Sequence, residues 1–299
     1  MRVRAGTTGW RDPGLRALRS AFDRASASYD VHAVLHAQVR AELLERLDVL
    51  GFTPATVLDL GAGTGQATRA LRERYRRARV LALDLAPGML AEAGARQSWR
   101  RRFDRVCADA ARLPLRAGSV DLVFSSLMLQ WAVDLDAVLA EARRVLAPRG
   151  CLTFATFGPD TLCELRAAWR AVDALRHVND FPDMHTLGDA LVRAGLADPV
   201  MDVDRHTLSY TSAAALMRDL KRVGAQSVLA GRPAGLAGRA RLARVEAAYG
   251  EFRLPDGRLP ATYEVIYGQA WCPGDTAPVR ARRGEVTIDV GAIARRPPR

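Results

Sequence analysis

One short stretch of the chain has the residue types and spacing of a nucleotide-binding turn. Asp59 closes an apolar run, and Gly61, Gly63 and Gly65 then occupy alternate positions. Glycine adopts positive φ and lets a ligand approach the backbone closely. A dinucleotide fingerprint, G-x-G-x-x-G, would need its third glycine at position 66, where the chain has Gln66. The stretch therefore predicts a strand, a cofactor-binding turn and a helix, and its spacing disfavours the alternative cofactor NAD.

The pattern D-x-G-x-G-x-G over residues 59–65 resembles motif I of the class I S-adenosylmethionine methyltransferases. This resemblance implies S-adenosylmethionine as the cofactor. That molecule carries no phosphate, which agrees with the lack of a G-K-[ST] sequence after the turn.

Polar residues follow the next three predicted strands. Asp84 closes the second strand, where a carboxylate can accept bonds from both ribose hydroxyls. Asp109 follows the third strand and could accept from the adenine amino group, while Ser125 and Ser126 would line the sulfonium side. Each acid could instead be a helix N-cap or a turn residue. The predicted cofactor residues are Asp59, Gly61, Ala62, Gly63, Gly65, Asp84, Leu85, Asp109, Ala110, Ser125 and Ser126.

Short apolar runs alternate with helical patterns along the first half of the chain. Strands are predicted at 57–60, 80–84, 106–108, 120–125 and 152–157, with a turn at 148–150, and later strands at 200–210 and 262–271. Helices are predicted within 16–50, at 66–75, from 87, at 135–146 and within 213–249. This alternation predicts βαβ units and a parallel sheet covered on both faces.

Composition narrows the possible functions. The chain has 299 residues, 49% of them hydrophobic, which is ample for a globular core. Its net charge of +11 favours acidic partners. The aromatic content of 6% offers few platforms for stacking bases, so no nucleic-acid partner is predicted. No apolar run is long enough to span a membrane, so no membrane association is predicted.

Cysteine and histidine spacing predicts neither disulfides nor a metal site. The four cysteines lack C-x-x-C spacing, which is typical of reduced thiols in the cytoplasm. His32 and His36 are four residues apart, but no third ligand accompanies them. We therefore expect a cytoplasmic protein without a bound metal. The sequence carries no pattern that predicts an oligomeric state.

The second half of the chain carries a more specific resemblance. Residues 157–166, FGPDTLCELR, match the signature F-G-x-D-T-L-x-E-L-R of the malonyl-acyl-carrier-protein O-methyltransferases of biotin synthesis. Further matching segments are 22–30, 181–185, 187–191, 199–203, 216–221 and 259–265. The chain resembles this family over about residues 16–272.

The resemblance implies a Rossmann-like class I methyltransferase of the α/β class, with a seven-stranded, mostly parallel sheet and helices on both faces. A single domain would cover 1–272, with a helical lid at 1–50 and helical insertions at 158–183 and 211–250. Residues 273–299 form a basic tail rich in proline and glycine.

The resemblance also implies the reaction. A methyl group would move to the free carboxylate of a malonyl thioester on an acidic acyl-carrier protein, or of malonyl-CoA, to prime synthesis of the pimelate moiety of biotin. Arg166, in the most family-specific motif, is the predicted partner of that carboxylate, because a guanidinium matches a carboxylate with two hydrogen bonds. Tyr29 and His177 are the other candidate catalytic residues.

An alternative enzyme class stays open at this point. The motifs D-T-L-x-E-L-R and P-A-T-Y also resemble a mitochondrial complex I assembly factor that hydroxylates an arginine, and so does the tail at 284–287. That resemblance implies an S-adenosylmethionine-binding hydroxylase or assembly factor.

Overall fold

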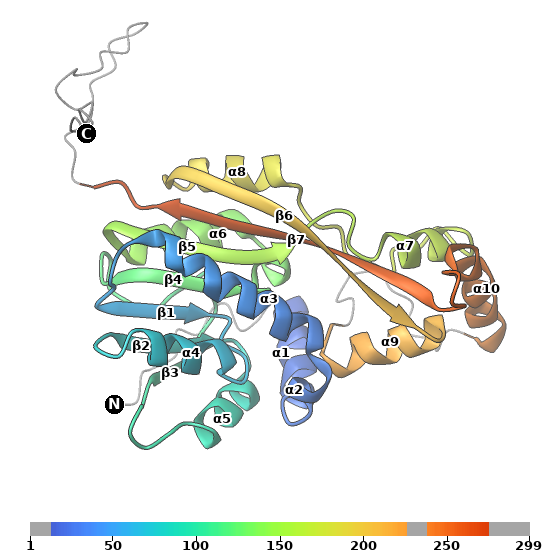
Figure 1. Cartoon of the computed structure of the whole chain (residues 1–299), viewed down its shortest axis with the longest axis horizontal. Helices are drawn as coiled ribbons and strands as arrows, with labels where there is room; N and C mark the ends of the chain where they lie inside the picture. Colours follow the sequence, from blue (N-terminus) through green and yellow to red (C-terminus); the bar gives the residue numbers. More distant parts are fainter. Residues whose placement is uncertain (1–12, 226–237, 275–299) are drawn as a thin grey trace, which may run out of the picture.

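The computed structural model describes residues 13–225 and 238–274, drawn in colour in Figure 1. Its strands are β1 (Thr56–Leu60), β2 (Arg79–Asp84), β3 (Asp104–Cys107), β4 (Val120–Ser126), β5 (Leu146–Phe157), β6 (Ala197–Tyr210) and β7 (Leu259–Trp271). Its helices are α1 (Pro13–Ala25), α2 (Tyr29–His32), α3 (Val34–Glu45), α4 (Gln66–Arg74), α5 (Pro87–Ala95), α6 (Leu135–Val145), α7 (Cys163–Arg170), α8 (Met184–Arg193), α9 (Ala213–Arg222) and α10 (Arg239–Tyr249). The 3₁₀ helices are η2 (Arg46–Leu50), η3 (Leu129–Trp131) and η4 (Gly250–Phe252).

The strands of the described residues form one seven-stranded sheet in the order β3-β2-β1-β4-β5-β7-β6. Strands β1 to β5 are parallel, and β7 runs antiparallel to both of its neighbours. The predicted fold class is confirmed. The strand order reverses between β1 and β4, which is where open α/β sheets bind their ligands.

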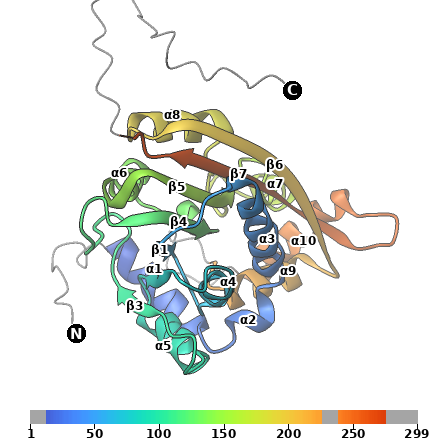
Figure 2. The ribbon, with the colours of Figure 1, turned by 60° about the vertical axis from the view of Figure 1, so that its left-hand side comes forward.

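Alternating side chains of the strands build two apolar cores. Val57 and Leu122 face the core that α3, α4 and α7 complete, whereas Leu58 and Val123 face the core under α6 and α8. Figure 2 shows the sheet between α3 on one side and α6 and α8 on the other. This arrangement follows from the period of two in a strand, which sends successive apolar residues to opposite faces.

The start of β5 differs from the prediction. The strand begins at Leu146 and includes the predicted turn at 148–150. Arg149 has a φ of 64°, and the pairing with β4 shifts register between Val120 and Leu122. The bent segment still bonds to β7, since Arg149 N donates to Cys272 O at 3.0 Å and Cys272 N donates to Gly150 O at 2.8 Å. The predicted turn residues 148–150 therefore form an irregularity inside a paired strand.

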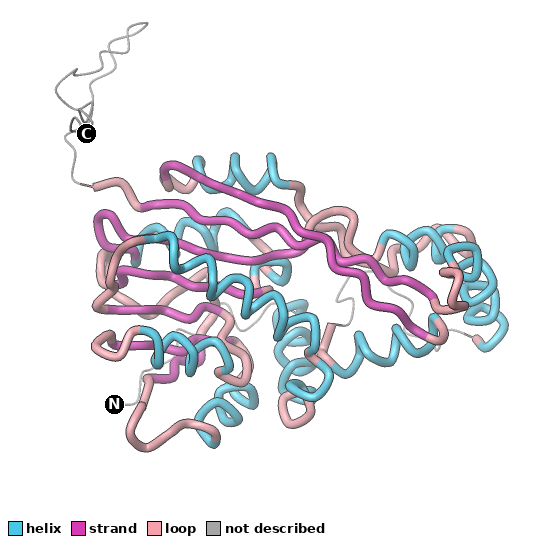
Figure 3. The backbone as a smooth tube through the Cα atoms, viewed as in Figure 1, coloured by secondary structure: helices cyan, strands magenta, loops and turns pink. Residues whose placement is uncertain are grey.

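A long ribbon of β6 and β7 extends beyond the parallel strands, as Figure 3 shows. These two strands pair from Ala197 with Trp271 to Tyr210 with Leu259. Helices α7, α9 and α10 gather at the far end of the ribbon (Figure 1). They occupy the predicted insertions at 158–183 and 211–250, of which 226–237 lies outside the described residues. The N-terminal segment 1–12 and residues 275–299 of the predicted tail at 273–299 also lie outside them. The same holds for the run 286–290 of that tail, whose sequence predicts a short strand.

None of the helices in the described part of the chain is long and apolar enough to cross a membrane.

Candidate functional site

A cavity of about 380 Å³ lies beyond the carboxyl ends of the parallel strands. Its size falls in the range of small-molecule sites, about 300–1,000 Å³. The walls come from α1 and α2, from the glycine turn after β1, from the ends of β2 and β4, and from the segments after β3 and β4. They include Leu15, Leu18, Phe22, Tyr29, Gly61, Gly63, Asp84, Leu85, Met89, Asp109, Ala110, Arg112, Ser126, Met128 and Trp131.

The glycine turn is held against the end of β2. The N–H groups of Gly61 and Ala62 both donate to the carbonyl oxygen of Leu83, at 2.8 and 2.9 Å. Gly61 has a φ of 81°, and a Cβ there would lie 2.3 Å from Cγ of Met128. Position 61 therefore requires glycine both for its backbone conformation and for the close approach of Met128.

Asp84 lines the cavity and organises the turn. Its Oδ2 accepts from Gly63 N and its Oδ1 from Ala86 N, each at 2.8 Å. Burial raises the pKa of this carboxyl, and the two backbone bonds act in the opposite direction. Because each carboxylate oxygen can accept more than one hydrogen bond, Asp84 keeps capacity for a ligand hydroxyl.

The segment after β3 supplies the opposite wall. Asp109 and Ala110 line the cavity there, as Leu85 and Ser126 do elsewhere on its surface. Oδ1 of Asp109 accepts from Ala111 N at 2.9 Å, which is the turn role that the sequence left open. Asp109 thus shapes its own loop and contributes to the cavity wall.

Four predicted cofactor residues lie outside the cavity wall. Asp59 is buried, and its Oδ2 accepts from Thr68 Oγ1 of α4 at 2.5 Å. Ser125 is also buried, and its hydroxyl donates to Leu60 O at 3.0 Å. Both side chains hold together the elements that carry the cavity. Ala62 and Gly65, also predicted, belong to the turn but are likewise absent from the cavity wall.

The helices α1 and α2 close the cavity, and two aspartates fasten them. Asp23 accepts from Gly88 N at 2.8 Å. Asp30 accepts from Thr64 Oγ1 at 2.6 Å and from Gln66 Nε2 at 2.9 Å, and it pairs with Arg96. Asp30 therefore connects the lid directly to the glycine turn. No local sequence pattern predicts the role of either aspartate, because each bonds to a segment remote in the chain.

Tyr29 is the one predicted catalytic residue that the structure places on the cavity wall. Burial, followed by the charges of Asp84 and Asp30, raises the pKa of its phenol, so the hydroxyl stays protonated. The ring of His36 lies edge-on to it at 5.7 Å. Burial lowers the pKa of His36 to about 4, so this imidazole is neutral. Tyr29 thus offers the cavity a hydrogen-bond donor.

Arg166 and His177 do not line the cavity. The guanidinium of Arg166 donates to Pro159 O at 2.8 Å and to Thr161 O at 2.9 Å. The ring of His177 stacks on Trp169 with centroids 3.6 Å apart, and its Nε2 lies 2.9 Å from Oδ1 of Asp173. In this structure both side chains stabilise the segment around α7, so they are not placed to contact a ligand of the cavity.

The charges on the cavity wall suit a cationic nucleoside. Among the described residues that line it, three carry a carboxylate, namely Asp84, Asp109 and Asp134, and one, Arg112, carries a guanidinium. Such a wall favours a positive charge and disfavours a polyphosphate. Aliphatic and aromatic walls with a few polar groups are typical of small-molecule sites. The residues present therefore fit S-adenosylmethionine, the cofactor expected from the sequence.

The buried carboxyl of Asp59 predicts a pH dependence of stability. Burial raises its pKa to about 7, whereas an unfolded aspartate titrates near about 3.9. The folded chain then binds more protons between these values, so this contribution to stability is fully present below about pH 4 and is lost as the pH rises to about 7. The slope for one proton is at most about 1.4 kcal/mol per pH unit.

Asp59→Asn should remove this pH dependence. Urea unfolding between pH 4.5 and 7.5 should show the wild type losing stability relative to the variant as the pH rises. Asp256→Asn, at an exposed loop position, serves as the control and should follow the wild type. Parallel curves for wild type and Asp59→Asn would contradict a raised pKa.

Asp30→Ala should loosen the lid. The variant loses hydrogen bonds to a charged acceptor, worth about 1.5–3 kcal/mol each, so we expect S-adenosylmethionine to dissociate at least about tenfold faster. Stopped-flow displacement measures this rate. Asp48→Ala, which removes the ion pair of Asp48 on η2 with Arg74 of α4, is the matched control. Equal dissociation rates in the two variants would show that Asp30 does not retain the cofactor.

Solved structures share this architecture. The YcgJ protein from Bacillus subtilis matches with a TM-score of 0.57 at 16% identity, covering 78% of this chain and 99% of that one. A methyltransferase solved in complex with the Haloferax volcanii Trm112 activator matches with a TM-score of 0.55 at 21% identity, covering 87% and 99%. At these identities the matches show the fold alone.

Similar sequences identify the family, whereas the solved structures show only the fold. Residues 58–154 match the family model of a methyltransferase domain. A malonyl-acyl-carrier-protein O-methyltransferase from Halorhodospira halophila is 51% identical over 282 residues, which cover 94% of this chain and 96% of the relative. A protein of the same name from Laribacter hongkongensis is 54% identical over 264 residues, covering 86% and 89%. The cofactor cavity and this likeness along nearly the whole chain lead to one conclusion: the chain belongs to the malonyl-acyl-carrier-protein O-methyltransferase family.

Proposed function

We propose that the chain methylates the free carboxylate of a malonyl group carried on acyl-carrier protein, with S-adenosylmethionine as the methyl donor. The observation that carries this proposal is the identity of 51–54% to relatives named for that reaction, over most of both chains. The acidic cavity at the strand-order reversal supports it, because it suits the cationic donor. The product would serve biotin synthesis, as the family resemblance implies.

The cavity residues suggest how the cofactor is held. Asp84 would accept from the ribose hydroxyls, and Asp109 from the adenine amino group. The backbone at Gly61 and Gly63 would lie under the methionine part, where the turn lacks side chains. Leu85, Ala110 and Ser126 would complete the wall.

Little acid–base chemistry is needed from the chain. S-adenosylmethionine, when bound, supplies an electrophilic methyl group whose departure leaves a neutral thioether. A malonyl carboxylate is already ionised at neutral pH, so no general base is required. The main tasks of the protein are therefore to align the reactants and to exclude water. The lid formed by α1 and α2, with Phe22 and Tyr29 on its inner surface, is suited to the second task.

Tyr29 is our candidate for orienting the substrate carboxylate. Its phenol lines the cavity and stays protonated, so it can donate a hydrogen bond to an anion. Arg166, which the sequence favoured, has two of its guanidinium nitrogens bonded to backbone carbonyls, and His177 is bonded to Asp173. The role in substrate binding therefore passes from these residues to Tyr29.

The proposal also includes the partner, the cellular location and the domain bounds that the sequence predicts. An acidic carrier protein fits the net charge of +11, and malonyl-CoA is the smaller alternative substrate. A cytoplasmic location agrees with the state of the four cysteines, which are all free thiols. We keep 1–272 as one catalytic domain with its lid at 1–50 and insertions at 158–183 and 211–250. The hydroxylase or assembly-factor alternative is not favoured, because the relatives carry the methyltransferase name.

Mass spectrometry of malonyl-acyl-carrier protein tests the reaction directly. After incubation with S-adenosylmethionine and the full chain, the carrier should gain one methyl group, and base hydrolysis of the ester should remove it. Asp84→Ala should weaken cofactor binding by about 1–3 kcal/mol and slow the gain. If the mass of the carrier protein stays unchanged after incubation with S-adenosylmethionine and the full chain, the proposed function is refuted.

Tyr29→Phe tests the orienting role, since it removes only the hydroxyl group. Loss of a hydrogen bond to a charged group is worth about 1.5–3 kcal/mol, so we expect kcat/KM for the malonyl substrate to fall about 10- to 100-fold. The affinity for S-adenosylmethionine, measured by calorimetry, should stay within about twofold of the wild type. Tyr75→Phe, on the far end of α4, is the matched control. Wild-type turnover by Tyr29→Phe would exclude its hydroxyl from substrate binding.

A further inference from the structure

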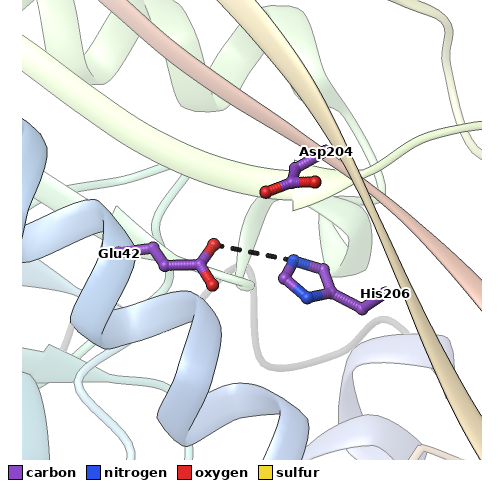
Figure 4. A group of neighbouring side chains, drawn as sticks. All are labelled: Glu42, Asp204 and His206. Atoms are coloured by element: carbon purple, nitrogen blue, oxygen red, sulfur yellow. Dashed lines mark ion pairs between the residues drawn. The ribbon is translucent and has the colours of Figure 1, made fainter.

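A second group of ligating side chains lies away from the cofactor cavity. Glu42 of α3 faces Asp204 and His206 of β6, and Figure 4 shows the three side chains converging. One ligand atom from each residue lies within 4.8 Å of the other two. None of these residues lines the cofactor cavity or takes part in the proposed reaction.

The geometry of β6 explains why these groups meet. Asp202, Asp204 and His206 occupy alternate positions of one strand, so their side chains point to the same face of the sheet. Helix α3 lies over that face, and Glu42 of α3 and Arg46 of η2 both reach β6. Arg46 pairs with Asp202 at 3.0 Å. Asp204 and His206 are thereby left facing Glu42.

His206 is the unusual member of the group. Its side chain is only 8% exposed, and its Nε2 has no hydrogen-bond partner. A buried polar atom without a partner costs about 1–3 kcal/mol, so this nitrogen calls for a ligand. Oε2 of Glu42 lies 3.6 Å from this nitrogen, which is too long for a hydrogen bond. Figure 4 marks this pair with a dashed line.

That separation suits a shared metal ion. Two ligands at about 2.05 Å from a tetrahedral Zn²⁺ are about 3.4 Å apart, close to the 3.6 Å between Nε2 and Oε2. Asp204 is exposed, so solvent could complete the coordination. The two carboxylates also carry the charge that a dication requires. Among the ion pairs of the described residues, none joins either carboxylate to an arginine or lysine.

Neighbouring groups already orient the Glu42 carboxylate. Tyr267 of β7 donates from its hydroxyl to Oε2 at 2.5 Å, and Gln38 donates from Nε2 to Oε1 at 3.2 Å. Such outer partners are typical of metal sites, where they fix the direction of a ligating side chain.

We propose that Glu42, Asp204 and His206 form a binding site for a divalent transition-metal ion, with Zn²⁺ as the ion that fits the donors best. One imidazole and two carboxylates favour such an ion over Mg²⁺, which prefers oxygen ligands alone. The ion would fasten α3 to β6. Helix α3 follows α2 after a single residue, Ala33, and Glu42 lies near the opposite, C-terminal end of α3.

Isothermal titration of the metal-free full chain with ZnCl₂ tests this proposal. The wild type should bind one equivalent, and Glu42→Gln, Asp204→Asn and His206→Gln should each bind at least tenfold more weakly. His185→Gln, an exposed histidine on α8, is the matched control and should leave the affinity unchanged. Saturating Zn²⁺ should raise the melting temperature of the wild type by roughly 5 °C and should not raise that of His206→Gln.

Cobalt substitution separates this site from the four thiols. Co²⁺ bound by nitrogen and oxygen ligands gives visible d–d bands without the ultraviolet charge-transfer band of a thiolate. Those bands should disappear in His206→Gln and persist in His185→Gln. Absence of zinc binding, a thiolate band at one equivalent, or unchanged affinity in His206→Gln would each overturn the proposal.

Discussion

The attachment of the glycine turn to the end of β2 is the constraint on which the site depends. The carbonyl of Leu83 receives two N–H groups of the turn, and Asp84 receives the N–H of Gly63. These bonds fix the floor of the cavity before any ligand is present. The lid then binds to the same turn, because Asp30 accepts from the hydroxyl of Thr64. Floor and lid are thus positioned by one five-residue segment.

The parallel half of the fold could be predicted because its signals are local. Each of β1, β2 and β4 is a short apolar run, and the helices between them have clear helical spacing. The start of β5 could not be predicted in the same way. Pro148 and Gly150 are typical of a turn, but the backbone of this segment pairs with Cys272, more than a hundred residues later. In a large sheet, pairing with a remote strand can override the local preference of a segment for a turn.

The sequence predicts which polar residues follow the ends of the strands, but it does not predict the direction in which their side chains point. Asp84 and Asp109 follow their strands and do line the cavity. Asp59 occupies a similar position by sequence, yet it points beneath the turn to Thr68. Arg166 lies in the most family-specific motif, but its guanidinium turns back to the loop before α7. Family-specific residues can therefore maintain a loop, and a motif alone does not distinguish this role from ligand binding.

Burial also decides which groups in and near the cavity carry charge. Burial keeps Tyr29 protonated and His36 neutral, and it raises the pKa of Asp59 to about 7. For Asp84, two backbone N–H groups oppose the rise in pKa that burial causes. A cationic cofactor then meets a carboxylate on the floor and a neutral donor on the lid. Because the Tyr29 phenol is neutral, it can donate a hydrogen bond to an anionic substrate without repelling it.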